Sequence, residues 1–188
     1  MEVCVYLKIH SSLNRHQEIE AMIKPLSNEF IWLSINQVKL SLQEDELVSL
    51  MIMFPTFQHD LGVTLSAVIG FDHPIIMEDS MAYVFQHFPG KVLNVAEILL
   101  LSRMDHENHL MKDADALFTK VSYEEMATAR MYLMTGLNAK KSASNLYLHR
   151  NTFNYRLKKF LQTTKLDLRN MAQARYLENW ILLKQSEI

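Results

Sequence analysis

The spacing of apolar residues changes along the chain and predicts strands and helices in alternation. Residues 3–9 are β-branched and apolar enough for a strand, and residues 16–26 repeat their apolar positions at helical spacing. Two strand-like runs, 30–35 and 38–43, flank a plausible turn at 36–37. The first part of the chain is therefore expected to follow the order β-α-β-β.

A helix and a fourth strand complete this part. Residues 44–54 begin with three acids, which favours a helix start, and the pattern breaks near Pro55. Residues 63–71 form a fourth strand-like run. The order β-α-β-β-α-β is that of the ferredoxin-like split βαβ fold, an antiparallel sheet backed by two helices, and it uses about the first 72 residues.

The remaining pattern is helical. One more helix is predicted over 78–88, and Pro89-Gly90 is the clearest break in the chain. After the break, helices are predicted over 92–104 and 122–134, separated by a polar stretch over 105–115. We therefore expect the α+β class, with two domains: an α+β domain at residues 1–90 and an all-α domain at residues 91–188.

The second domain contains the layout of a helix-turn-helix, with its core at about 138–163. A short helix from Ala139 and a tight connection at 147–149 precede a longer helix at about 150–162. At about 100° per residue, four residues of the longer helix share an inward stripe, and four others face outward. The inward residues are Phe153, Leu157, Phe160 and Thr164, and the outward residues are Asn151, Tyr155, Lys158 and Gln162.

Charge is concentrated in this helix-turn-helix. The 188 residues are 49% hydrophobic and 21% charged, which is enough apolar material for a packed core. The formal net charge of -2 taken alone argues against a nucleic-acid partner. Residues 138–169, however, hold eight Lys and Arg against one acid, a charge of +7, and the rest holds eleven against twenty, a charge of -9.

This basic segment predicts contacts with double-stranded DNA, because an α-helix fits the major groove with its N-terminal residues at the base edges. The candidates for base contacts are Arg150, Asn151, Asn154 and Tyr155. The candidates for phosphate contacts are Thr152, Arg156, Lys158, Lys159, Lys140 and Lys141. His149 either approaches the DNA backbone or closes the turn, and the ring of Tyr155 either contacts DNA or leans on the neighbouring helix. A solvated basic face is the alternative, which the concentration of charge disfavours.

Residues 142–170, SASNLYLHRNTFNYRLKKFLQTTKLDLRN, resemble the C-terminal helix-turn-helix of the PucR/CdaR regulators, which are bacterial transcription factors. The motifs that match are HRNT-x-x-YRL, the LDL after it, and the lead-in SYEEMATARMYLMTGLN, over about residues 117–185. A closing helix ends this region, with Met171, Ala174, Leu177 and Ile181 facing inward. Lys165 stands where relatives often have a glycine, so we expect the end of the longer helix to be capped without that easily left-handed residue, or by another geometry.

The resemblance implies a degenerate cyclase-like, GGDEF-like fold for the N-terminal domain. Residues 27–30, SNEF, are similar to the GGDEF signature but lack its two glycines, so we expect no enzyme activity and no cofactor. Members of the family are much longer and begin with a sensory domain, so we expect this chain to be a short form that lacks it. The resemblance therefore assigns no small-molecule effector.

Other candidate chemistry is sparse. Cys4 is the only cysteine, so it forms no disulfide framework and is expected to be a small core residue. Residues 105–109, DHENH, contain metal-ligand types without the HExxH spacing, so a solvated connector is expected and no metal. No apolar run is long enough for a signal peptide or a membrane span, which predicts a cytoplasmic protein without a membrane partner.

The sequence thus predicts a DNA-binding transcriptional regulator of the PucR/CdaR type that acts as a homodimer. Dimerisation would use the N-terminal domain or the helical connector, where residues 99–101 are candidates for either a dimer surface or the core. The alternative is a shortened regulator that does not bind DNA and acts by dimerising with a longer relative.

Overall fold

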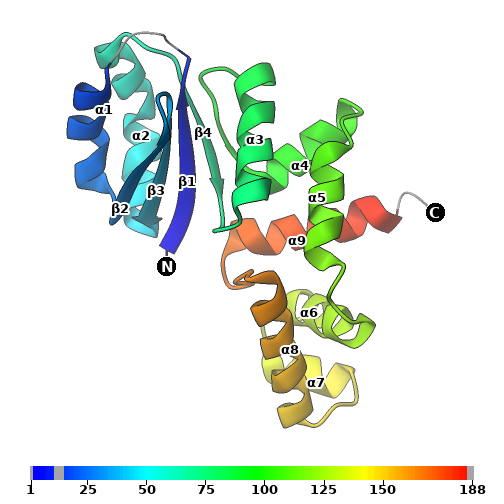
Figure 1. The fold of residues 1–188 in the computed structure, drawn as a ribbon. Helices are drawn as coiled ribbons and strands as arrows, with labels where there is room; N and C mark the ends of the chain where they lie inside the picture. Colours follow the sequence, from blue (N-terminus) through cyan, green and yellow to red (C-terminus); the bar gives the residue numbers. More distant parts are fainter. Residues whose placement is uncertain (1, 11–14, 186–188) are drawn as a thin grey trace. The chain divides into compact units, whose positions relative to one another are not determined.

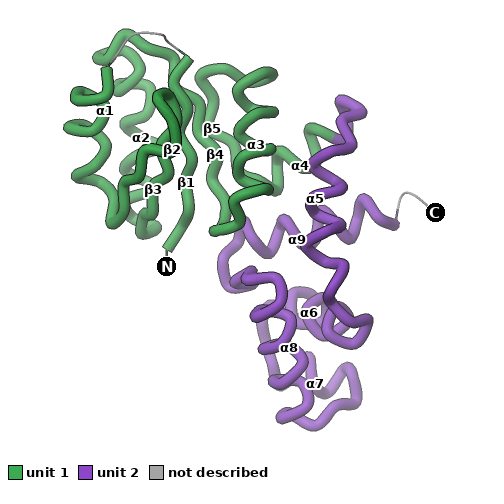
Figure 2. Tube along the Cα trace, viewed as in Figure 1, with its two compact units in different colours: residues 1–102 green, residues 103–188 purple. Residues whose placement is uncertain are grey.

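The computed structural model describes residues 2–10 and 15–185. It contains two compact units, an N-terminal unit of residues 1–102 and a C-terminal unit of residues 103–188 (Figure 2). Residues 91–102 group with the sheet of the N-terminal unit. The domain boundary at residue 90 stays a prediction.

A five-stranded sheet with the order β2-β3-β1-β4-β5 forms the N-terminal unit (Figure 1). Its strands are β1 (Glu2–Ile9), β2 (Glu29–Ser34), β3 (Gln37–Gln43), β4 (Leu65–Gly70) and β5 (Val92–Asn94). The helices are α1 (His16–Ile23), the 3-10 helix η1 (Lys24–Leu26), α2 (Glu44–Leu61), α3 (Pro74–His87) and α4 (Val95–Met104). Strands β1 to β4 pair antiparallel, and β5 pairs parallel with β4. The predicted α+β class and the order β-α-β-β-α-β are confirmed.

The prediction of a single helix over 92–104 is wrong at its start, because residues 92–94 form β5. Val92 pairs with Ala67 of β4, and the helix begins only after Asn94. The Asn94 side chain accepts hydrogen bonds from the backbone N–H groups of Ala96 and Glu97, and Glu97 accepts one from the Asn94 N–H. This reciprocal cap fixes the helix start, while a strand of three residues is too short to show a period of its own.

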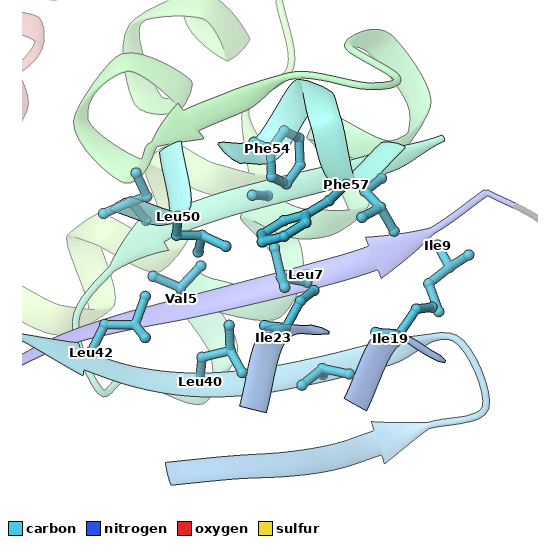
Figure 3. Close-up of a cluster of buried hydrophobic side chains, with 14 of the residues drawn as sticks. Val5, Leu7, Ile9, Ile19, Ile23, Leu40, Leu42, Leu50, Phe54 and Phe57 are labelled. Carbon is cyan, nitrogen blue, oxygen red and sulfur yellow. The ribbon is translucent and has the colours of Figure 1, made fainter. Parts of the chain in front are cut away.

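The core of the N-terminal unit lies between the sheet and helices α1 and α2, while α3 covers the other face (Figure 1). Figure 3 shows side chains from β1, β3, α1 and α2 that meet in this core: Val5, Leu7, Ile9, Leu40, Leu42, Ile19, Ile23, Leu50, Phe54 and Phe57. On the other face, a Cβ atom on Gly70 would lie 2.5 Å from the Met77 sulfur. Glycine is therefore needed where α3 approaches β4.

Helix α2 continues through Pro55 to Leu61, so the expected break near this proline is wrong. A proline inside a helix removes one backbone hydrogen bond, and here the ring is on the exposed side of α2. Leu50, Phe54 and Phe57 hold the helix on the sheet on both sides of the proline. Packing of the buried face therefore outweighs the local break.

The C-terminal unit consists of α5 (His109–Phe118), α6 (Tyr123–Met134), α7 (Ala139–Asn145), α8 (Arg150–Thr164) and α9 (Met171–Gln185). Helix α5 begins inside the predicted polar stretch 105–115, at the end of the expected connector, and buries Leu110, Met111, Ala114 and Phe118. The Phe118 ring lies 4.3 Å from that of Trp180, centroid to centroid, and Asp115 accepts hydrogen bonds from the side chains of Trp180 and Lys184. These contacts hold α9 against α5.

The closing helix α9 buries a face that differs in part from the predicted one. Leu177 is buried as expected, but Met171 is exposed, so its inward assignment is wrong. Met171 opens the helix directly after Asn170, whose side chain accepts hydrogen bonds from the first-turn N–H groups. Gln173 in the first turn is buried instead, and its side chain accepts a hydrogen bond from the Asp167 N–H.

Across the described residues, no helix combines the length and the apolar character needed to cross a membrane.

Candidate nucleic-acid interface

Helix α8 packs on α6 and α7 through the predicted inward stripe (Figure 1). Phe153, Phe160 and Thr164 are fully buried, and Leu157 is half-buried. The Phe153 ring lies 6.1 Å from that of Tyr132 on α6, centroid to centroid. The stripe that fixes the rotation of α8 about its axis is therefore the one expected from its periodicity.

The opposite face of α8 is exposed along its whole length. The predicted outward residues Asn151, Tyr155, Lys158 and Gln162 are all exposed, as are Arg150, Thr152 and Asn154 at the start of the helix. Arg156 is half-buried at the edge of this face. The residues predicted to read base edges are thus brought to one end of one helix face.

Helix α7 presents its two lysines beside a small polar hollow. The side chain of Asn138 accepts a hydrogen bond from the Lys141 N–H and so caps the helix. Ser142 is buried and its hydroxyl lies 2.6 Å from the Thr135 hydroxyl at the end of α6, which fixes the two helices to each other. Lys140 and Lys141 remain exposed and line a hollow of about 290 Å³ together with Asn138, Ser144 and Asn145.

The turn between α7 and α8 uses a left-handed residue that is not glycine. The Leu148 N–H donates to the Ala143 carbonyl and the Tyr147 N–H to the Ser144 carbonyl, which is the hydrogen-bond pattern of a Schellman motif. Tyr147 adopts φ +54° there, and its side chain is 96% exposed. Tyr147 is not among the residues predicted from the sequence, because a turn without glycine does not indicate which residue is left-handed.

His149 is the residue that caps α8. Its Nδ1 atom accepts a hydrogen bond from the Asn151 N–H at 3.3 Å, and its backbone is extended. The imidazole therefore satisfies one of the unpaired N–H groups at the start of the helix, as Ser or Asn does in other helices. Of the two roles expected for His149, closing the turn has a direct structural basis.

The cations around α8 differ in whether an acid already neutralises them. Lys159 forms a 2.7 Å ion pair with Glu125, a buried acid on α6. The Lys159 ammonium holds the pKa of Glu125 below its usual range, against the burial that would raise it. Within residues 2–10 and 15–185, the other five basic side chains predicted for DNA make no hydrogen bond or ion pair: Lys140, Lys141, Arg150, Arg156 and Lys158.

The end of α8 is left-handed despite the lack of glycine. Lys165 adopts φ +58° and its N–H donates to the Leu161 carbonyl. The helix is thus capped without a glycine, which is one of the two expected outcomes, and Lys165 itself takes the left-handed conformation. Leu166 and Leu168 of the LDL motif are buried directly after it, and Asp167 between them pairs with Arg169. Burial of the two leucines holds the chain in this conformation.

The remaining candidate groups lie outside this surface. Cys4 is buried in the sheet, and burial raises the pKa of its thiol to about 12. His109 lies 3.3 Å from Glu107, but among the residues that the structure describes no three His, Cys, Asp or Glu side chains are placed to hold a metal ion. The SNEF segment lies at the start of β2.

Comparison with known proteins finds similarity to a described family within the C-terminal unit. Residues 126–179 match the family described as the PucR C-terminal helix-turn-helix domain. The proline-responsive transcriptional activator PutR of Bacillus subtilis (strain 168) is 32% identical to this chain over 65 residues, which are 35% of this chain and 16% of PutR. A leucine-rich protein of Streptococcus dysgalactiae subsp. equisimilis is 27% identical over 139 residues, which cover 66% of this chain and 49% of that protein. The chain thus covers less than half of the length of either relative.

One solved structure is similar over nearly the whole chain. The crystal structure of a regulator of polyketide synthase expression from Bifidobacterium adolescentis aligns with 99% of this chain and 81% of that one, with a TM-score of 0.48 and 16% identity.

Proposed function

Because residues 126–179 match the PucR C-terminal helix-turn-helix family, we propose that the chain is a transcriptional regulator that binds double-stranded DNA through α8 in the major groove. We propose that it acts in the cytoplasm and as a homodimer, since two half-sites are the usual way for such a module to gain affinity. We propose no catalytic step and no cofactor for it, and we assign no effector.

The observation that carries this proposal is the set of five cations around α8 that no acid neutralises. A cation paired within the protein gains little from a phosphate, whereas an unpaired one releases counterions when it contacts DNA. Lys140, Lys141, Arg156 and Lys158 are therefore assigned to the phosphate backbone, together with the hydroxyl of Thr152. Lys159 stays a candidate for phosphate contact with a smaller expected contribution, because its ammonium already pairs with Glu125.

Base contacts are assigned to the first turns of α8. Arg150, Asn151, Asn154 and Tyr155 are exposed there, and their donors and acceptors match those of base edges in the major groove. His149 caps the same end and would keep Asn151 in a fixed position relative to the bases. We expect Arg150 to contribute most to sequence preference, since arginine pairs bidentately with guanine.

The test is DNA binding by the purified chain to fragments from upstream of its own gene, measured by fluorescence anisotropy at several salt concentrations. Arg150→Ala is compared with Arg175→Ala, which removes an exposed arginine from α9 in the same unit. The proposal requires that binding weakens steeply with salt, prefers some fragments, and loses about 1–3 kcal/mol with Arg150→Ala but not with Arg175→Ala. Absence of binding at low salt would favour the alternative, a regulator that acts by pairing with another regulator chain.

A further inference from the structure

Helix α2 carries a second lengthwise stripe besides the one that faces the sheet. Six of its residues fall within an arc of about 100° when each residue is set at about 100° of rotation. These residues are Glu44, Val48, Met51, Ile52, Pro55 and His59, and all six are exposed. We call this set the outward stripe of α2.

The outward stripe is separate from the core. Leu50, Phe54 and Phe57 of the same helix point to the sheet in Figure 3, and Leu61 is buried as well. The middle of the stripe is nonetheless apolar, with Val48 54%, Met51 47% and Ile52 72% exposed. Residues 47–58 contain no charged side chain, although the solvent face of a surface helix usually carries several. An exposed apolar surface of this kind indicates a contact with another protein surface.

We propose that the outward stripe packs antiparallel against the same stripe of a second copy of this chain. A two-fold axis between positions 51 and 52 brings Val48 opposite Pro55 of the partner and Met51 opposite Ile52. The same axis brings Glu44 at the start of one helix opposite His59 at the end of the other. All three pairings follow from one axis, so the stripe is complementary to itself, as a symmetric dimer interface requires.

Charge selects a second copy over other occupants. The first turn of α2 is acidic, with Glu44, Asp45 and Glu46, and its last turn carries His59. Antiparallel packing places the acidic end of each helix beside the C-terminal turn of the other, and the two helix dipoles then oppose each other. Nucleic acid is disfavoured because the first turn of α2 holds three acids and residues 44–61 contain no Lys or Arg. The single stripe of each chain is a small interface, so we expect a reversible dimer that dilution dissociates.

This interface lies in the N-terminal unit and needs no DNA. It rests on the homodimer of the proposed function and deepens it, because it names the surface through which two helix-turn-helix modules would be joined. The two proposals can also fail separately, since dimerisation is measured without DNA and binding to a single half-site needs only one chain.

The first experiment is sedimentation velocity of the full chain over a range of concentrations, without DNA. Ile52→Glu is compared with Ile75→Glu, the same change at an apolar residue of the same unit that is 59% exposed on α3. We expect Ile52→Glu to raise the dimer dissociation constant about tenfold or more, because two carboxylates would be buried without partners. Ile75→Glu should leave it unchanged. A monomer at all concentrations, or a dimer that Ile52→Glu leaves intact, would overturn the proposal.

Cross-linking tests the direction of packing and does not depend on that variant. The double variant Val48→Cys/Pro55→Cys should give a covalent dimer when oxidised with copper phenanthroline, since each new cysteine faces the other kind on the partner. Within one chain the two positions are about 10 Å apart along the helix, too far for a disulfide. Each single variant should stay uncrosslinked, because its cysteine lies about 10 Å from its own symmetry mate. Cross-linking of Val48→Cys alone would indicate parallel packing and overturn the antiparallel assignment.

Discussion

Helices α2 and α8 are alike on their buried faces, which are apolar, and differ in the chemistry of their exposed faces. Each holds itself in place by a buried apolar stripe, with Leu50, Phe54 and Phe57 in α2 and Phe153 and Phe160 in α8. On the outside, α8 exposes Arg150, Asn151 and Lys158, whereas α2 exposes Val48, Met51 and Ile52. The buried face therefore determines where a helix packs, and the exposed face indicates which class of partner it can bind.

The largest effects are expected from the inner faces, where the two helices should behave alike. Phe54→Ala in α2 and Phe160→Ala in α8 each remove a buried ring and leave a cavity, which should lower the free energy of unfolding by about 3–5 kcal/mol. Urea unfolding followed by tryptophan fluorescence separates the units, because Trp32 lies in the N-terminal unit and Trp180 in the C-terminal unit. If either variant lowers the free energy of unfolding by less than about 1 kcal/mol, its ring is not part of a packed core.

The next effect concerns the outer face of α8 alone. Lys158→Glu should weaken binding to duplex DNA about tenfold or more at low salt, because a phosphate contact becomes a repulsion. Anisotropy titration measures the affinity, and urea unfolding should show little change because Lys158 has no partner among the described residues to lose. Lys120→Glu, which reverses an exposed charge between α5 and α6, serves as the control. An equal loss in both variants would mean that DNA responds only to the total charge of the chain.

A smaller pair of effects concerns the ends of the two helices. Gly62, with φ +62°, follows the last residue of α2, whereas Lys165 takes a similar conformation at the end of α8. A residue with a Cβ atom disfavours this region by about 1–2 kcal/mol. Lys165→Gly should therefore stabilise the C-terminal unit by about 1 kcal/mol, and Gly62→Ala should destabilise the N-terminal unit by a similar amount.

Urea unfolding of both variants measures this pair. No atom lies within 4 Å of a Cβ built on Gly62, so steric contact does not complicate the result there. Effects of the same sign in the two variants would contradict the assignment of left-handed strain to Lys165.

The sequence predicts buried positions best where apolar residues keep one helical spacing over several turns. The fifteen residues of α8 show which side chains are buried, because Phe153, Phe160 and Thr164 repeat with the helix period. In α2 the same reasoning failed at Pro55, since a local rule for proline does not include the packing of residues on either side of it. It failed also at β5, where three residues fit a strand or a helix equally well.

The candidate site was predictable in its exposed residues but not in its internal contacts. The periodicity of α8 places Asn151, Tyr155 and Lys158 outward, as the structure does. The ion pair of Lys159 with Glu125 joins residues from two helices, so it depends on how α6 packs on α8. The left-handed conformation of Tyr147 follows from the hydrogen bonds at the end of α7. Because this turn contains no glycine, the sequence does not predict that conformation.

The smallest effect expected is a pH dependence that belongs to α8 and not to α2. Lys159 lowers the pKa of Glu125 below its ordinary value of 4.5, so the folded C-terminal unit holds this proton less tightly than the unfolded chain. The contribution to stability is complete above the ordinary pKa and is lost as the pH falls through the lowered one.

Glu125→Gln should flatten the dependence of the urea midpoint on pH between about 3 and 6, whereas Glu124→Gln, at an exposed neighbour, should not. Part of the slope should remain, because Arg169 lowers the pKa of Asp167 in the same unit. Glu125→Gln should change the slope of the Trp180 signal and leave that of the Trp32 signal unchanged, since Glu125 belongs to the C-terminal unit and the N-terminal unit has its own acid with a lowered pKa, Glu20. Equal slopes for Glu125→Gln and the unchanged chain would show that the ion pair does not anchor α8, and its packing on α6 would then rest on the apolar stripe alone, as the packing of α2 on the sheet does.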